Sequence, residues 1–170
     1  MRPTAESERV IAVHESLTAA GIPHAVGGAV ALGYYADPRP IRDIDVNVFV
    51  PPERRAEVEE ALAGLDDERP PVHLFFAEDA LHAAMPPAVR EVPFAGATIP
   101  IVSPEHLVIR KAMLDREKDW PDIEAILIAT EPLDLKEIRR WLHLAARPEA
   151  AWASLARTQG SEARGAHSGA

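Results

Sequence analysis

The segment 43–50, Asp-Ile-Asp-Val-Asn-Val-Phe-Val, constrains the fold of this chain more than any other part of its sequence. Polar residues alternate with aliphatic ones over its first six positions, which is typical of a strand that buries one face. Because neighbouring side chains of a strand point to opposite faces, Asp43 and Asp45 share one face and the aliphatic residues share the other. The pattern therefore predicts a sheet in which one strand carries two carboxylates side by side.

The predicted carboxylate pair indicates a cation site. Strands are depleted in aspartate, and two like charges on one face repel each other unless a cation lies between them. A hard divalent ion with oxygen ligands satisfies such a pair, so we expect Asp43 and Asp45 to bind Mg²⁺, with Mn²⁺ as the alternative ion. Phosphoryl or nucleotidyl transfer is the chemistry that most often uses this arrangement. The competing interpretation is a solvated strand face without a ligand.

Two glycines, Gly27 and Gly28, stand between a short predicted strand and a predicted helix. Glycines at such a turn let backbone N–H groups approach a phosphate, and the helix N-terminus favours the anion. The alternative is a tight turn that needs only the backbone angles of glycine. Arg39 and Arg42, just before the aspartates, are candidates to bind a triphosphate or an RNA backbone, or else to neutralise the aspartates.

The whole pattern predicts an α/β (α+β) fold, with a mixed sheet flanked by helices and a C-terminal helical segment. The predicted strands cover residues 24–26, 43–50, 72–77, 90–94 and 97–102. The predicted helices cover residues 7–20, 29–35, 53–65, 78–85, 104–115, 120–129 and 135–146. We expect a core at 7–102, helices at 103–157 that pack on it, and a disordered tail at 158–170.

The composition narrows the class of protein. With 170 residues and no cysteine, the chain can bury a core but cannot form disulfides or thiolate metal sites. No apolar run is long enough for a membrane helix and the N-terminus does not read as a signal peptide, so we expect a cytoplasmic protein without a membrane partner. The net charge of −9 argues against a broad nucleic-acid surface, although it leaves room for a local basic groove.

These motifs together resemble the nucleotidyltransferase superfamily, which has a polymerase-beta-like fold. The resemblance rests on Gly27-Gly28 followed by Arg-Pro-Ile-Arg-Asp-Ile-Asp at 39–45. Later stretches are similar to the AbiEii-type branch, which includes type IV toxins and their relatives. These stretches are Val-Pro-Phe-Ala-Gly at 92–96, Ile-Pro-Ile-Val-Ser-Pro-Glu-His-Leu at 99–107, Lys-Ala at 111–112, and Asp-Arg-Glu-Lys-Asp-Trp-Pro-Asp-Ile-Glu at 115–124. The resemblance covers residues 10–142.

The resemblance implies Mg²⁺-dependent transfer of a nucleoside monophosphate from a nucleoside triphosphate to a hydroxyl acceptor. It matches Lys111 to a lysine near the nucleotide phosphates and makes Asp119, with Asp122 as a further candidate, an active-site residue. The plain alternatives are an exposed helical lysine and carboxylates that stabilise a helix N-terminus. The implied acceptor is RNA, such as the 3′ end of tRNA, with toxin-type growth control by a cognate antitoxin protein. A small-molecule hydroxyl is the other acceptor, and the acidic net charge favours it.

Two positions depart from the family pattern. His73 stands on the strand position that usually carries a third carboxylate, and Ile41 replaces a small hydroxyl residue before the aspartates. A histidine can accept a proton or bind a metal, but it is a poor ligand for Mg²⁺. The sequence therefore supports two hypotheses: an active nucleotidyltransferase, or a catalytically silent domain of the same fold that binds nucleotides or a partner protein.

Overall fold

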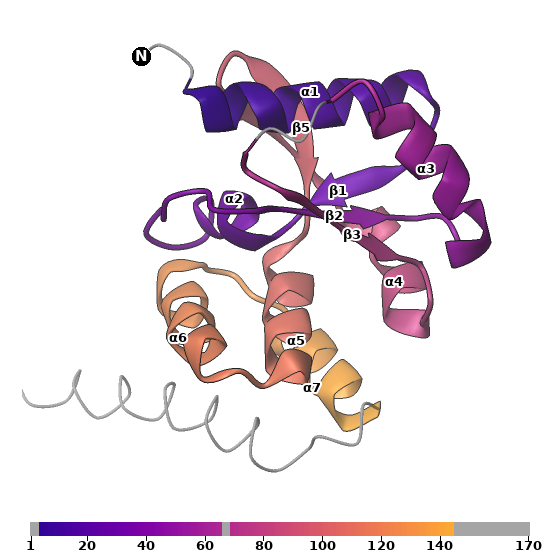
Figure 1. Cartoon of the computed structure of the whole chain (residues 1–170). Coiled ribbons are helices and arrows are strands. Elements are labelled where there is room, and N and C mark those ends of the chain that lie inside the picture. Colours follow the sequence, from indigo (N-terminus) through magenta and orange to yellow (C-terminus); the bar gives the residue numbers. More distant parts are fainter. Residues whose placement is uncertain (1–3, 66–68, 145–170) are drawn as a thin grey trace, which may run out of the picture. The chain divides into compact units, whose positions relative to one another are not determined.

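Five strands form one mixed sheet within residues 4–65 and 69–144, which are the residues that this computed structural model describes (Figure 1). Their order across the sheet is β3-β2-β1-β5-β4. The strands are β1 (His24–Val26), β2 (Ile44–Val48), β3 (Val72–Phe76), β4 (Arg90–Phe94) and β5 (Ala97–Ile101). β1 runs antiparallel to β2 and parallel to β5, β2 runs parallel to β3, and β4 and β5 form an antiparallel hairpin. The mixed sheet expected from the sequence is confirmed.

Strand β2 buries the face that its sequence pattern assigns to the core. Its three aliphatic side chains, Ile44, Val46 and Val48, are fully buried, whereas Asp45 is only half-buried. The strand is shorter than the predicted 43–50, so Asp43 lies one residue before it. The alternation of faces is nevertheless as the sequence predicts.

Helices α1 (Ala5–Ala19) and α3 (Arg55–Leu62) lie against each other over one face of the sheet (Figure 1). α1 begins with a capping box, in which the side chains of Thr4 and Ser7 bond to each other's backbone N–H groups. The fully buried residues of α1 recur at helical spacing, as expected for a helix with one apolar face. They are Val10, Val13 and Leu17.

Short helical elements complete this part of the chain: α2 (Gly28–Leu32), η1 (Pro52–Arg54), α4 (Ala80–Ala84) and η2 (Pro86–Ala88). α2 and α4 are shorter than the predicted 29–35 and 78–85. α4 starts later because the Asp79 carboxylate accepts a hydrogen bond of 2.8 Å from the N–H of His82, which makes Asp79 the N-cap.

The chain divides into two compact units. The first holds the sheet, with described residues 4–34, 38–65 and 69–103. The second holds residues 35–37 and 104–144, with α5 (Pro104–Leu114), η3 (Glu117–Asp119), α6 (Trp120–Ala129) and α7 (Leu135–Leu144). α5 contacts both α6 and α7. The predicted tail at 158–170 lies outside the described residues.

No helix in the described part of the chain combines the length and the apolarity that crossing a membrane requires.

Candidate functional site

Three potential metal ligands meet near the start of strands β2 and β3. Asp45 is the direct register partner of His73 on the parallel neighbouring strand, and Asp43 immediately precedes β2. The Nδ1 atom of His73 lies 3.4 Å from Oδ1 of Asp45 and 3.8 Å from Oδ2 of Asp43. One ligand atom from each residue lies within 4.8 Å of the other two. The predicted aspartate pair therefore forms one cluster with the histidine at the third position.

The cluster fits a divalent cation. Adjacent ligand atoms around an octahedral ion with bonds of about 2.1 Å lie about 3 Å apart, so the separations from His73 need only small side-chain movements. The side chains of Asp43, Asp45 and His73 are 43%, 28% and 52% exposed. Such partial exposure leaves coordination positions open to water or to the oxygens of a substrate.

Gly28 makes room for the carboxylate of Asp45. Its φ of +52° is an angle that other L-residues rarely adopt. A Cβ atom at this position would overlap the carboxylate and would stand 3.0 Å from Asp45 Cγ. The second glycine of the pair is thus required sterically by the aspartate that follows seventeen residues later.

The backbone N–H of Gly27 is already used inside the sheet. Its N–H donates to the carbonyl oxygen of Asp45 at 2.7 Å, so this donor joins β1 to β2 and does not face a phosphate. The N–H groups of the first turn of α2 have no acceptor within the helix, as at every helix start. Phosphate binding at the glycine pair stays a prediction, and it depends on those first-turn groups.

Asn47 extends the polar face of β2 and was not singled out from the sequence. It lies two residues beyond Asp45, is 4% exposed, and its Nδ2 atom would lie 3.1 Å from a Cβ on Gly27. Its buried Oδ1 has no hydrogen-bond partner among residues 4–65 and 69–144. Buried polar atoms normally have partners, so this acceptor is a candidate to bind substrate or water. The i, i+2 spacing that joins the two aspartates was the signal for it.

Arg39 and Arg42 are exposed in the segment between α2 and β2. Their predicted contact with a triphosphate or with RNA stays a prediction.

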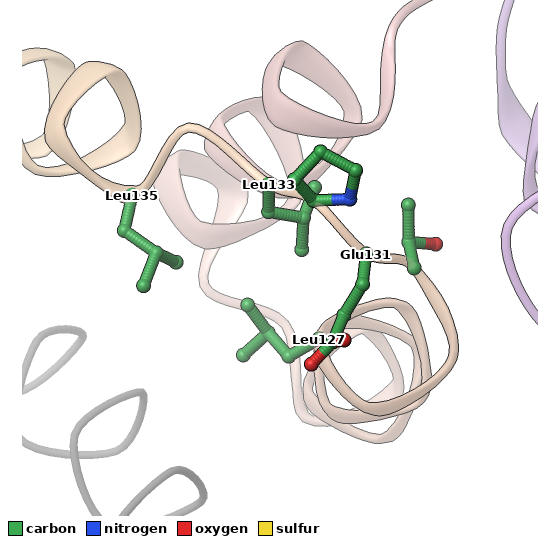
Figure 2. Close-up of a pocket in the computed structure, with 6 residues that line it drawn as sticks. Leu127, Glu131, Leu133 and Leu135 are labelled. Carbon is green, nitrogen blue, oxygen red and sulfur yellow. The ribbon is translucent and has the colours of Figure 1, made fainter.

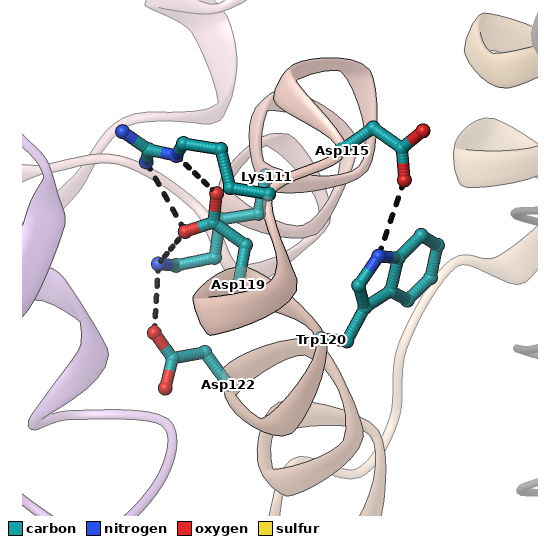
Figure 3. A network of polar contacts seen from close by, with 6 residues as sticks. Lys111, Asp115, Asp119, Trp120 and Asp122 are labelled. Atoms are coloured by element: carbon teal, nitrogen blue, oxygen red, sulfur yellow. Dashed lines mark hydrogen bonds and ion pairs between the residues drawn. The ribbon is translucent and has the colours of Figure 1, made fainter.

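Lys111, Asp119 and Asp122 come together within the second unit (Figure 3). The ammonium group of Lys111 lies 2.9 Å from Asp122 Oδ2 and 3.3 Å from Asp119 Oδ1. The side chains of these three residues are 11% or less exposed. Arg116 makes two further bonds to the carboxylate of Asp119. The geometry shows an ion cluster that joins α5 to the start of α6, and the predicted catalytic roles of Lys111 and Asp119 stay predictions.

Asp119 is held in its ionised form by this cluster. Burial, the largest influence, opposes its ionisation, but the hydrogen bonds and charges of Arg116 and Lys111 together lower its pKa below the ordinary value. Beside the cluster, the indole N–H of Trp120 donates to Asp115 at 3.2 Å (Figure 3). Trp120 is partly buried and has a hydrogen-bonding role here.

A separate pocket of about 430 Å³ opens where α6 passes into α7 (Figure 2). Its volume would admit a small ligand. The described residues that line it include no cation, and Glu131 is its one ionisable group. Among these described lining residues a nucleoside triphosphate would meet a carboxylate and no positive side chain, which does not favour triphosphate binding here.

Comparison with solved structures decides the fold. The crystal structure of ANT(2'')-Ia in complex with adenylyl-2''-tobramycin matches with a TM-score of 0.56 at 17% identity, over 84% of this chain and 98% of the other. The crystal structure of an antigenic nucleotidyltransferase-like protein from Paracoccidioides brasiliensis matches with a TM-score of 0.57 at 16% identity, over 91% and 94%. The chain has the nucleotidyltransferase fold.

A solution structure of the antibiotic-resistance factor ANT(2'')-Ia also shares the nucleotidyltransferase fold, with a TM-score of 0.52 at 19% identity, over 92% of this chain and 99% of the other. No protein-family profile and no curated protein sequence matches the chain significantly. At these identities the structural likeness establishes the fold, and the chemistry must be argued from the side chains of this chain.

Proposed function

We propose that this chain is a divalent-cation-dependent nucleotidyltransferase that moves a nucleoside monophosphate from a nucleoside triphosphate to a hydroxyl acceptor. The observation that carries the proposal is the Asp43–Asp45–His73 cluster on a sheet of nucleotidyltransferase topology. The sequence resemblance implies Mg²⁺ as the ion. The two carboxylates agree with it, because they are hard oxygen ligands.

Each residue of the cluster has a role in this proposal. Asp43 and Asp45 hold the cation, and Gly28 keeps the Asp45 carboxylate in place. The cation, when bound, neutralises the phosphate oxygens and helps the acceptor hydroxyl to lose its proton. The hydroxyl gives its proton to solvent and its oxygen bonds to the α-phosphorus. The bond from that phosphorus to the oxygen shared with the β-phosphorus breaks, and pyrophosphate leaves. Most of the acceleration would come from positioning and charge stabilisation.

Phosphate binding by Lys111 and by the arginines before β2 is part of the proposal. Lys111 is supported by the AbiEii-type resemblance, although it already contacts Asp119 and Asp122. Arg39 and Arg42 are supported by their exposure and their place just before the aspartates.

Two classes of acceptor have support. A small hydroxyl compound of positive charge suits a chain of net charge −9, and the structural neighbour ANT(2'')-Ia was solved with adenylyl-2''-tobramycin. The AbiEii-type resemblance instead supports an RNA acceptor such as a tRNA 3′ end, with an antitoxin protein as partner. We favour the small molecule, because a negatively charged chain repels the RNA backbone.

A second candidate function is a silent domain that binds nucleotide without transferring it. His73 favours this candidate, because the third carboxylate of the resembled family is replaced. The two functions differ in one measurable product, since only transfer releases pyrophosphate.

The test is pyrophosphate release by the purified chain with a divalent cation, each nucleoside triphosphate, and either aminoglycosides or total tRNA. We expect release with one class of acceptor and a fall of about a hundredfold or more in Asp45→Asn, which removes a cation ligand. Asp37→Asn is the matched control, because Asp37 is an exposed aspartate outside the cluster. Release that is equal in Asp45→Asn and wild type would refute the proposal. Release only in His73→Asp would support the silent domain.

A further inference from the structure

We infer that His73 is a third ligand of the cation and that it shifts the preference of the site from Mg²⁺ towards transition-metal ions, with Mn²⁺ preferred over Mg²⁺. This inference rests on the proposed function, since it assumes that the Asp43–Asp45 cluster holds a cation. The inference explains the histidine at the position of the third carboxylate by a change in metal preference, and not by a loss of activity.

The strand register brings the imidazole to the carboxylates. β3 runs parallel to β2, and His73 is the register partner of Asp45, so backbone pairing keeps the two side chains on the same side of the sheet. β3 is an edge strand, and the His73 side chain is 52% exposed. The ring therefore has room to adjust towards an ion.

The distances favour shared coordination. His73 Nδ1 lies 3.4 Å and 3.8 Å from the nearest oxygens of Asp45 and Asp43, slightly beyond the separation of about 3 Å expected for adjacent ligand atoms. The contacts are long for charge-assisted hydrogen bonds, which are usually about 2.7–2.9 Å. The spacing of the three groups is therefore closer to that of ligands around one ion than to that of direct hydrogen-bond partners.

The donor set decides the preference among ions. Mg²⁺ strongly prefers oxygen ligands, whereas imidazole nitrogen suits the later first-row transition metals, whose affinities generally rise from Mn²⁺ to Cu²⁺ and fall again at Zn²⁺. Mn²⁺ accepts the carboxylates as readily as Mg²⁺ does, and it tolerates nitrogen better. Two carboxylates with one imidazole should therefore bind Mn²⁺, Co²⁺ or Zn²⁺ in preference to Mg²⁺.

A bland explanation competes with this one. His73 could serve only as a counter-charge for Asp43 and Asp45, in which case a bound cation would displace it. Under that explanation no nitrogen atom is bonded to the ion, and replacing His73 by aspartate changes the affinities for Mn²⁺ and Mg²⁺ alike.

The experiment measures metal binding without any transfer reaction. Tag-free protein is titrated with Mn²⁺, the free ion is followed by electron paramagnetic resonance, and Mg²⁺ is added as competitor. Pulsed resonance of the bound ion then detects coupling to a ligand nitrogen. The variants are His73→Asp, which supplies an oxygen ligand, and His73→Gln, which keeps the side chain neutral and similar in size. His143→Asp is the matched control, because His143 is exposed on α7.

We expect wild type and His143→Asp to show nitrogen coupling and to prefer Mn²⁺. In both His73 variants the coupling disappears. In His73→Asp the ratio of the Mg²⁺ to the Mn²⁺ dissociation constant falls by roughly tenfold or more, since even residues behind metal ligands alter affinity by that amount. Absence of Mn²⁺ binding in wild type, coupling that persists in both variants, or an unchanged ratio would each overturn the inference.

Nitrogen-coupled Mn²⁺ without pyrophosphate release would leave the inference standing and contradict the proposed transfer. Pyrophosphate release by a protein whose bound Mn²⁺ shows no nitrogen coupling would contradict the inference about His73 and leave the proposed transfer standing.

Discussion

At the scale of single residues, the candidate site depends on a steric match between Gly28 and Asp45. The glycine adopts a φ of +52°, and the space that its missing side chain leaves is filled by the carboxylate. The backbone conformation of Gly28 and the position of a candidate metal ligand are therefore coupled.

Replacing Gly28 by alanine should damage activity more than stability. The methyl group would displace the Asp45 carboxylate, and a misplacement of about 1 Å can lower kcat/KM by about a hundredfold. The strained φ should cost about 1–2 kcal/mol of unfolding free energy. Gly21→Ala is the matched control, because Gly21 has a φ of +67° with nothing within 4 Å of the added Cβ. We expect both variants to lose similar stability in urea unfolding and only Gly28→Ala to lose activity; equal activities would contradict the steric match.

A second residue-scale feature is the contact between His14 and His24. His24 is 7% exposed, its Nδ1 lies 2.8 Å from the carbonyl of Ile22, and its Nε2 lies 3.0 Å from Nδ1 of His14. Because Nδ1 of His24 donates to the carbonyl, its Nε2 must accept from His14 in the neutral pair. Burial, the largest cause, and the charge of His14 lower the pKa of His24, whereas the Ile22 carbonyl acts to raise it.

The lowered pKa of His24 predicts a loss of stability in acid. Below the ordinary histidine pKa of about 6.5 the unfolded chain takes up the proton before the folded chain does, so the unfolding free energy falls as the pH drops through that value towards the folded pKa. The slope from one group is at most about 1.4 kcal/mol per pH unit. Above pH 7 both states are neutral at this residue, and the effect is absent. Unfolding free energies measured with urea between pH 5 and 8 should depend less steeply on pH in His24→Asn than in wild type. The same pH dependence in both proteins would exclude His24 as the cause.

At the scale of secondary structure, α5 and α6 are joined by buried charges as well as by apolar packing. Lys111 on α5 contacts Asp119 and Asp122 at the start of α6, and all three side chains are almost fully buried. Breaking a buried ion pair by removing one partner leaves an uncompensated charge, which is costly.

Lys111→Met should therefore lower the unfolding free energy by about 3 kcal/mol, because two buried carboxylates lose their shared cation. Adding Asp122→Asn should recover part of the loss, since it removes one of those carboxylates. Urea unfolding of the single and double variants checks both statements. A Lys111→Met protein of wild-type stability that binds nucleotide poorly would show instead that the lysine serves the phosphates.

The sequence predicts some of these elements better than others, for physical reasons. β2 alternates polar and aliphatic residues, and α6 has Pro121 in its first turn followed by an apolar pattern. The predicted bounds of both elements are therefore close to the observed ones. α2 has only five residues, too few for periodicity to define its end. The aspartate pair follows from strand spacing, and the place of His73 follows from the family resemblance. The strand register puts His73 beside Asp45, and their role in binding a cation stays a prediction. The packing of Gly28 on Asp45 could not be predicted from the sequence. It depends on the φ angle of Gly28 and on how the turn at Gly28 packs against β2, and neither follows from a local sequence pattern.

At the scale of the whole molecule, the sheet topology and the net charge bear on function in different ways. The topology is that of nucleotidyltransferases, and it places two candidate cation ligands, Asp45 and His73, on adjacent parallel strands. The charge of −9 acts over the surface, where it favours the approach of cationic molecules over that of nucleic acid. This long-range attraction should weaken as salt is added, because screening is strong beyond about 10 Å at 0.1 M ionic strength.

The central claim is that the Asp43–Asp45 cluster supports transfer of a nucleotidyl group, and the position of an isotope tests it most directly. The purified chain is incubated with Mn²⁺ or Mg²⁺, the acceptor found by pyrophosphate release, and triphosphate labelled at either the α- or the γ-phosphorus. We predict that the α-label appears on the acceptor, that the γ-label appears in pyrophosphate, and that Asp45→Asn abolishes both. Transfer of the γ-label to the acceptor, or α-label transfer that survives in Asp45→Asn, would contradict the account.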